Sequence, residues 1–170
     1  MIITFFREPR GRYHSTFTRP DGAVLKLQGG SYNKLGGGVR VPHDIAHLVV
    51  EQTLGLRGGL WGTIAVGGLV MNLEYIGGRK PPHSEKKSWA ITDAAGETLR
   101  QAEVVVRAVA DAAAGTVNGS LAQHMGDRWA VPVSREQLEL MHAQLRNSAA
   151  RWNQVPEGGT LAMTWSSRAS

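Results

Sequence analysis

Alternation of hydrophobic and polar residues marks the first thirty positions of the chain. Three alternating segments, residues 2–7, 12–19 and 23–28, are separated by the strings EPRG and PDG. Both strings are typical of turns, because Pro presets one turn dihedral and Gly accepts a positive φ. A period of two is typical of strands with one buried face. The pattern therefore predicts an antiparallel β-meander, and residues 160–165 alternate in the same way and predict a strand that returns to it.

Helical periodicity replaces the alternation after Pro42. Proline suits the first turn of a helix, and the apolar positions that follow it predict a helix over residues 42–54. An Ala- and Val-rich segment predicts a second helix over residues 97–114. The capping box S-x-x-Q opens a third helix over residues 134–152.

The middle of the chain is harder to assign. Residues 60–75 are apolar nearly all round, so their length favours a buried helix whereas Gly67 and Gly68 argue for a buried pair of strands. The Gly-rich residues 29–38 predict a flexible loop, and the Pro-containing, basic residues 77–87 predict an exposed, mobile flap.

Length and composition fit these elements into one domain. The chain has 170 residues, of which 42% are hydrophobic and 19% charged, as in ordinary globular proteins. We expect a single domain over residues 1–170 of the α+β class. Its architecture would be a small antiparallel β-meander plus a C-terminal strand, with three or four helices packed on one face.

The amino acids that are missing exclude several kinds of protein. The chain has no cysteine, which excludes disulfide scaffolds, thiolate metal sites and thiol nucleophiles. Any metal would have to be held by His, Asp or Glu. The N-terminus lacks the pattern of a signal peptide, and the longest apolar stretch, residues 60–73, is shorter than the roughly 20 residues of a membrane helix. We therefore expect a cytoplasmic protein without a membrane span.

Positive charge is concentrated in the first half of the chain. The formal net charge is +5, and residues 1–88 carry 12 Lys and Arg against 6 Asp and Glu. These cations are scattered and form no dense stripe with interleaved aromatic residues, so nucleic acid is not the expected partner. The substrate and the oligomeric state stay open.

One segment carries recognisable chemistry: the string PHDIAHLVVE in the predicted first helix. His43 and His47 are four residues apart, so they lie on one helix face about 6 Å apart along the axis, where two imidazoles can converge on one metal ion. Asp44 follows the first histidine, where an acid can activate a metal-bound water. Zinc or another divalent ion is the cofactor that this spacing favours.

The third ligand of such a site has two candidates. Glu51 continues the same helix face, although it lies about 12 Å from His43 along the axis; it is either a ligand or a carboxylate that orients His47. Glu74 would arrive from another element. The alternative to a metal site is an exposed polar helix face on which the histidines, Asp44 and Glu51 are solvated.

The H-D-x-x-H string resembles two zinc motifs. It looks like the motif of the ubiquinone-biosynthesis coenzyme Q4 family, in which a glutamate follows after eleven residues; here that position is Gly59. It also looks like a zincin motif with Asp in place of Glu, and that resemblance implies a third ligand glutamate from a later helix, for which Glu74 has a compatible spacing. The H-D-I-A-H core is also similar to an element of HD-domain phosphohydrolases. The longer string P-H-D-x-x-H-x-x-V-E resembles small bacterial proteins and implies no activity.

Two functions follow as expectations. The first is a small soluble metal-binding protein, a zinc-dependent hydrolase with His43, His47 and Glu51 as metal residues and Asp44 as the proton carrier. The alternative is a non-enzymatic accessory protein whose basic face binds an acidic partner or nucleic acid.

Overall fold

A computed structural model describes residues 1–31, 40–80, 84–115 and 133–166 of the protein. Its centre is a five-stranded antiparallel sheet in the order β4-β3-β2-β1-β5. The strands are β1 (Ile2–Glu8), β2 (Arg12–Thr18), β3 (Ala23–Ser31), β4 (Leu73–Gly78) and β5 (Thr160–Thr164). The first three form the predicted meander. The last strand of the sequence pairs with the first, as the alternation of residues 160–165 predicted.

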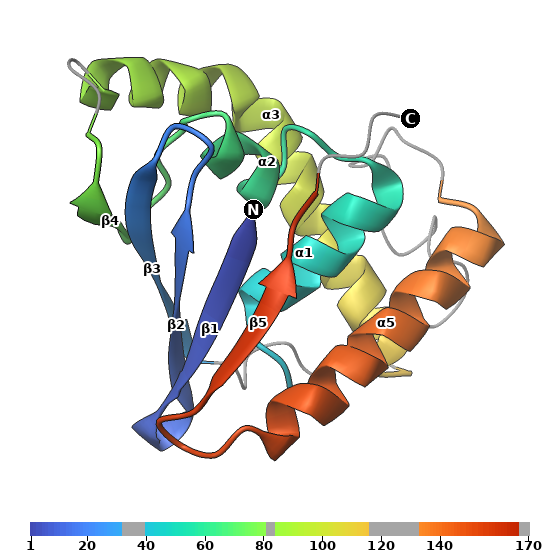
Figure 1. Ribbon diagram of the computed structural model, residues 1–170. Coiled ribbons are helices and arrows are strands. Elements are labelled where there is room, and N and C mark those ends of the chain that lie inside the picture. Colours follow the sequence, from blue (N-terminus) through green and yellow to red (C-terminus); the bar gives the residue numbers. More distant parts are fainter. Residues whose placement is uncertain (32–39, 81–83, 116–132, 167–170) are drawn as a thin grey trace.

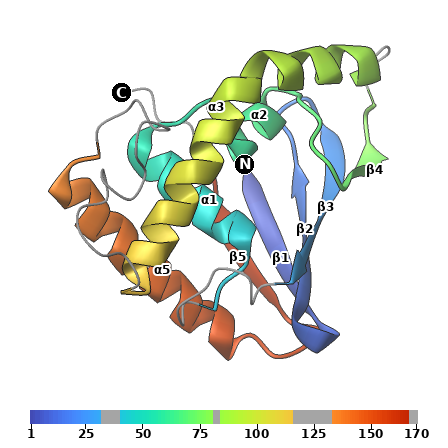
Figure 2. The same ribbon diagram turned by 180° about the vertical axis from the view of Figure 1, so that it is seen from behind.

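In the described residues, four α-helices lie together on one side of this sheet (Figures 1 and 2). They are α1 (His43–Leu54), α2 (Leu60–Ala65), α3 (Ser84–Ala113) and α5 (Arg135–Gln154), and a single 3₁₀ turn, η1 (Pro9–Gly11), joins β1 to β2. Helix α1 occupies the middle of the layer and contacts the other three helices. The predicted α+β class is confirmed.

Aromatic side chains join the sheet to the helices. Trp61 of α2 is fully buried, and its ring meets those of Phe5 and Phe17 edge to face at centroid distances of 6.1 and 5.4 Å. Tyr13 of β2 meets Trp152 of α5 in the same way at 6.5 Å. Edge-to-face contacts of this kind add to the free energy of burial, so these rings fix where α2 and α5 sit on the sheet.

Residues 60–75, for which helix and strand both stayed open, contain one of each: helix α2 at their start and the first residues of strand β4 at their end. The helix ends at Ala65, and the chain then turns through Gly67, whose φ is +107°. A side chain at Gly68 would overlap Thr63, so only glycine permits this close turn. Residues 73–78 form β4, hydrogen-bonded to β3 at the edge of the sheet.

The two predicted loops are partly wrong. Strand β3 continues through Gly29 and Gly30 to Ser31, because pairing with β2 outweighs the low strand propensity of glycine. The rest of that predicted loop, residues 32–39, lies outside the described residues. Of the predicted flap, residues 77–78 belong to β4 and residues 84–87 to α3, which begins well before residue 97; residues 81–83 lie outside the described part.

None of the helices in the described residues is both long and apolar enough to span a bilayer.

Candidate metal centre

Helix α1 places two histidines on the face that it turns toward α3. The helix begins at His43, directly after Pro42, and ends at Leu54, which is followed by Gly55 in the left-handed conformation. The spacing of four residues brings the rings of His43 and His47 to a centroid distance of 4.6 Å and an interplanar angle of 82°. The His43 side chain is 36% exposed, whereas that of His47 is 1% exposed.

Helix α3 contributes a carboxylate to the same place. Oε1 of Glu103 lies 3.2 Å from Nε2 of His47, and Oε2 of Glu103 lies 3.4 Å from Nε2 of His43. One ligand atom from each of these three side chains lies within 4.8 Å of the others. We call His43, His47 and Glu103 the metal-capable group, because two imidazoles and one carboxylate can hold a divalent ion.

A second carboxylate holds the other side of the His47 ring. Glu51 is 1% exposed, and its Oε1 lies 3.0 Å from Nδ1 of His47. Three backbone N–H groups at the start of α2 donate hydrogen bonds to the same carboxylate: those of Leu60 (2.6 Å), Trp61 (3.0 Å) and Gly62 (3.4 Å). These hydrogen bonds fix the position of the carboxylate. They also give a partner to N–H groups of the first helical turn, which have none inside a helix.

This arrangement determines which nitrogen of His47 is free to bind a ligand. An ionised carboxylate only accepts hydrogen bonds, so Nδ1 of His47 carries the proton that it donates to Glu51. In the neutral ring Nε2 is then a lone-pair donor. That Nε2 atom is buried and has no hydrogen-bond partner among the described residues, despite its distance of 3.2 Å from Glu103. A buried nitrogen of this kind suits a metal ion, and a carboxylate behind the ring is what metal-bound histidines commonly have.

Gly59 makes the contact between Glu51 and α2 possible. A Cβ atom at position 59 would lie 2.3 Å from the Glu51 carboxyl carbon and 2.5 Å from its Oε1. No side chain fits there without moving the carboxylate. Glycine at this position therefore allows Glu51 to hold the His47 ring.

Asp44 lies beside the metal-capable group, at the first turn of α1. It is 7% exposed, its Oδ1 is 4.0 Å from Nδ1 of His43, and its Oδ2 has no hydrogen-bond partner within the described ranges. The backbone of Asp44 is held on both sides: its N–H donates to the Tyr13 hydroxyl and its carbonyl accepts from Nε1 of Trp61. Sheet and α2 thus fix the start of α1.

The pKa values describe a site that favours positive charge at His47. Burial alone would lower the pKa of His47, but the carboxylates of Glu103 and Glu51 outweigh it and raise that pKa to about 9. Burial and the nearby charge of His47 lower the pKa of His43 to about 4. Burial also raises the pKa of Asp44 to about 6, against the opposing effect of His47. A metal ion would replace the proton on His47 as the positive charge between the two carboxylates.

A pocket of about 450 Å³ opens beside the metal-capable group. His43, Asp44 and Glu103 contribute to its wall, whereas the buried His47 does not. Most of the remaining wall is apolar and includes the half-exposed Trp89. A small molecule or a side chain of a larger one could therefore reach the three residues from solvent.

The structure brings together most of the residues singled out from the sequence. His43, His47, Asp44 and Glu51 lie in one place, and the low exposure of the last three rules out the solvated polar face. Glu51 contacts Nδ1 of His47 and the start of α2, and within the described residues it is not a member of the metal-capable group. Glu74 lies on β4 with an exposed side chain and is not in the metal-capable group.

Glu103 is the residue that sequence reasoning missed. It lies in the predicted helix over residues 97–114, directly after the buried Ala102, so it is at the border of the apolar stripe of that helix. An acid at the border of an Ala- and Val-rich stripe is the signal that could have identified it. The sequence does not indicate that this apolar stripe of α3 packs against α1.

Comparisons of the chain with protein-family models, with curated proteins and with solved structures find no match. The zinc-motif likenesses therefore rest on the H-D-x-x-H string alone, and the site is argued from its geometry.

Proposed function

We propose that the protein is a metal-dependent hydrolase in which His43, His47 and Glu103 hold a zinc ion. The observation that carries the proposal is the buried His47, whose Nδ1 is hydrogen-bonded to Glu51 and whose buried Nε2 lies 3.2 Å from Glu103 and beside His43. Glu51, predicted as a metal residue, acts in this proposal by fixing the orientation and tautomer of His47.

The donor set supports zinc and hydrolysis. Two imidazoles and one carboxylate leave a fourth position for water, which is the arrangement of catalytic zinc, and a bound zinc ion lowers the pKa of that water toward neutrality. The adjoining pocket gives a substrate access to the same place. Asp44 borders this pocket with a buried oxygen that has no partner in the described part of the chain, so it is the candidate to take the proton from the water.

The first experiment measures metal content. Purified, untagged protein is loaded with zinc, exchanged into chelator-free buffer and analysed by plasma mass spectrometry beside the His43→Ala/His47→Ala and Glu103→Gln variants. We expect about one zinc ion per chain in the wild type, none in the double variant and a weaker site in Glu103→Gln. His14→Ala, on the sheet, is the matched control and should keep the metal.

The second experiment tests the chemistry. Zinc-loaded protein is screened against chromogenic esters, phosphoesters and peptide amides, and any activity is measured again in Asp44→Asn. We expect that variant to bind zinc normally and to lose a factor of about 10²–10⁴ in turnover. A wild type without zinc after loading would overturn the metal site, and full turnover in Asp44→Asn would overturn the role of Asp44.

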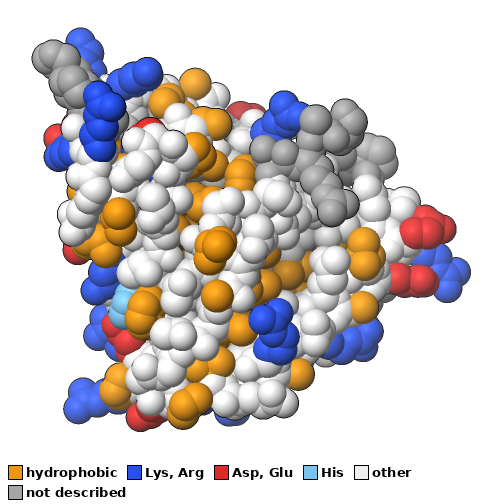
Figure 3. All heavy atoms as spheres, viewed as in Figure 1, with side chains coloured by type: hydrophobic (Ala, Val, Ile, Leu, Met, Phe, Trp, Pro, Cys, Tyr) orange, Lys and Arg blue, Asp and Glu red, His pale blue; other side chains and the backbone are white. Residues whose placement is uncertain are grey.

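A second candidate function rests on a group of cations. Arg79, Lys80, Lys86 and Lys87 are exposed at the end of β4 and the start of α3, where Lys and Arg gather at the upper left of Figure 3. Such a group supports the accessory protein, which would bind an acidic partner. Binding that weakens steeply with salt and ignores zinc removal would favour this candidate over the hydrolase.

A further inference from the structure

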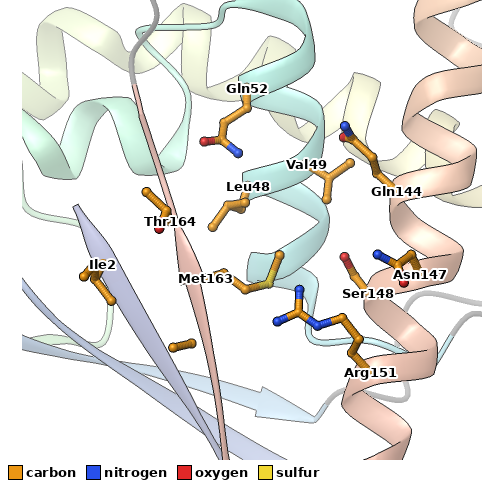
Figure 4. A pocket seen from close by; sticks show the side chains of 11 residues that line it. Ile2, Leu48, Val49, Gln52, Gln144, Asn147, Ser148, Arg151, Met163 and Thr164 are labelled. Atoms are coloured by element: carbon orange, nitrogen blue, oxygen red, sulfur yellow. The ribbon is translucent and has the colours of Figure 1, made fainter.

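A second pocket lies on the opposite face of α1 from the metal-capable group. It measures about 500 Å³ and runs between β5 and α5, with Leu48 and Val49 of α1 as its floor (Figure 4). Met163 of β5 closes it from the sheet side. We call it the β5–α5 groove. Nothing in the proposed hydrolysis uses it.

The groove is bordered by an open edge of the sheet. Trp165 exchanges backbone hydrogen bonds with Met1, and Met163 lies opposite Ile3. In an antiparallel pair the residues between such partners direct their N–H and C=O groups away from the neighbouring strand. Ala162 and Thr164, which line the groove, therefore present their backbone groups to it.

The side chains on the wall formed by α5 include amides and an arginine, which can donate hydrogen bonds, and none of them is acidic. Helix α5 directs Gln144, Asn147 and Arg151 toward the groove, and Arg151 extends toward β5 in Figure 4. Arg151 has no ion pair with any described residue, and the lining contains neither Asp nor Glu. The groove thus combines an apolar floor, a free cation and amide groups, and it matches a ligand with a negative charge and its own backbone-like groups.

One contact already shows how this edge is used. Ser166 follows Ala162 and Thr164 at the same spacing of two residues, so its backbone N–H also points away from β1. This N–H donates to Oε1 of Gln52 of α1 at 2.8 Å. The amide side chain takes the place that a carbonyl of a further strand would occupy. The remaining positions of the edge, at Ala162 and Thr164, have no such partner among the described residues.

We propose that the β5–α5 groove binds an extended peptide segment of another protein, which adds as a sixth strand to β5 and places an acidic side chain at Arg151. Backbone hydrogen bonds to an open sheet edge provide affinity in this mode of recognition, and side-chain contacts provide specificity. The apolar floor takes the side chains on one face of the segment, because alternate residues of a strand point to the same side.

Nuclear magnetic resonance of the ¹⁵N-labelled full chain tests the proposal. The probe is the blocked pentapeptide acetyl-Ser-Val-Glu-Val-Ser-amide, compared with the same peptide carrying Gln in place of Glu. We expect the Glu peptide to shift the amide signals of Ala162 and Thr164 at millimolar concentration and to bind about two- to fivefold more tightly than the Gln peptide, as exposed ion pairs allow.

Three variants separate the contributions. Arg151→Gln should remove the preference for the Glu peptide, whereas Arg146→Gln, an exposed arginine on the same helix outside the groove, should leave it unchanged. Ala162→Pro deletes one outward N–H and should abolish binding of both peptides, while the signals of β1 report that the sheet is intact.

The proposal fails if neither peptide moves the Ala162 and Thr164 signals, or if Arg146→Gln weakens binding as much as Arg151→Gln. Equal shifts with free acetate would show a small-anion site and would also overturn it. None of these outcomes depends on zinc, so the two proposals are tested separately.

Discussion

Glu51 shows how much a single side chain can organise at the scale of the residue. Its carboxylate accepts from His47 and from three backbone N–H groups of α2, and it is almost completely buried. A buried carboxylate is costly unless it is fully hydrogen-bonded. The same contacts that satisfy Glu51 therefore hold His47 in one orientation and one tautomer.

We predict that Glu51→Gln weakens zinc binding by about 10- to 100-fold, as loss of the carboxylate behind a metal-bound histidine commonly does. Competition with a zinc-sensitive dye measures the affinity, and circular dichroism checks the fold. Glu97→Gln, on the exposed side of α3 and paired with Arg100, is the matched control and should bind as the wild type does. Equal affinities in the two variants would show that Glu51 has no part in metal binding.

Gly59→Ala tests the same contact from the opposite side. The new methyl group would overlap the Glu51 carboxylate, so we expect a loss of about 1–3 kcal/mol in the free energy of unfolding and weaker zinc binding. Gly96→Ala is the control, because a Cβ there meets nothing within 4 Å and the residue lies inside α3. That change should stabilise the protein by about 0.5–1 kcal/mol. Urea unfolding compares the two, and a neutral Gly59→Ala would contradict the described packing.

The metal-capable group was only partly predictable, because some of its residues are placed by spacing within one helix and one is placed by packing between two helices. His43, His47 and Asp44 follow from helical spacing, which is local, and Glu51 lies one turn beyond. Glu103 depends on how α3 crosses α1, which is set by the packing of Val105, Val106 and Val109 in the core. No pattern within a single segment contains that information.

At the scale of the element, the turn between β2 and β3 depends on a buried cation. The Arg19 side chain is 2% exposed and donates to both oxygens of Asp21, at 3.1 and 2.6 Å. The Ala23 N–H donates to the same aspartate. The Arg19 guanidinium beside it holds the pKa of Asp21 below its usual range.

We predict that Asp21→Asn lowers the free energy of unfolding by about 1–2 kcal/mol at pH 7, because it leaves the buried Arg19 guanidinium without its counter-charge. The loss is no larger because Asp21 is partly exposed and solvent screens the ion pair. A lowered pKa stabilises the fold above the ordinary pKa of aspartate, and the effect is lost as the pH falls through the folded-state pKa. Urea unfolding from pH 7 to pH 3 should therefore show the difference between wild type and variant shrinking. Asp93→Asn, exposed on α3, should show no such difference at any pH.

Elements were predictable where the periodicity is strong and long. The meander, α1, α5 and β5 follow directly from their patterns, and the capping box at Ser134 is present as predicted. Strand β4 was not resolved from the alternatives left open for residues 60–75, because a period of two over Leu73–Gly78 is too short to be recognised beside a long apolar stretch. The early start of α3 was missed because prolines at positions 81 and 82 indicate a loop, although proline is also compatible with the approach to a helix.

On the scale of the whole molecule, contacts at the end of α5 join that helix to the first two strands of the sheet. Trp152 is fully buried against Tyr13, and Arg7 of β1 donates to the carbonyls of Trp152 and Val155 at 3.2 and 2.7 Å. These contacts add hydrogen bonds to carbonyl groups at the C-terminal end of α5, where the helical pattern of hydrogen bonds stops. The sheet and α5 are therefore joined by both packing and hydrogen bonds.

We predict that Trp152→Ala lowers the free energy of unfolding by about 3–5 kcal/mol, since it removes a large side chain from the core. Trp89→Ala, on a residue that is 45% exposed, should cost far less. Chemical denaturation followed by circular dichroism measures both. If the two variants lost similar amounts of unfolding free energy, Trp152 would not be the core residue that its packing indicates.

The pairing of β5 with β1 has a consequence for the order in which the protein is made. Strand β1 leaves the ribosome about 150 residues before its second neighbour in the sheet, residues 160–164. Until then one side of β1 has only unpaired backbone groups, which are a template for aggregation. A nascent chain thus carries an incomplete sheet until residues 160–164 have been made, and β1 gains its second neighbour only after all the helices that separate it from β5 in the sequence.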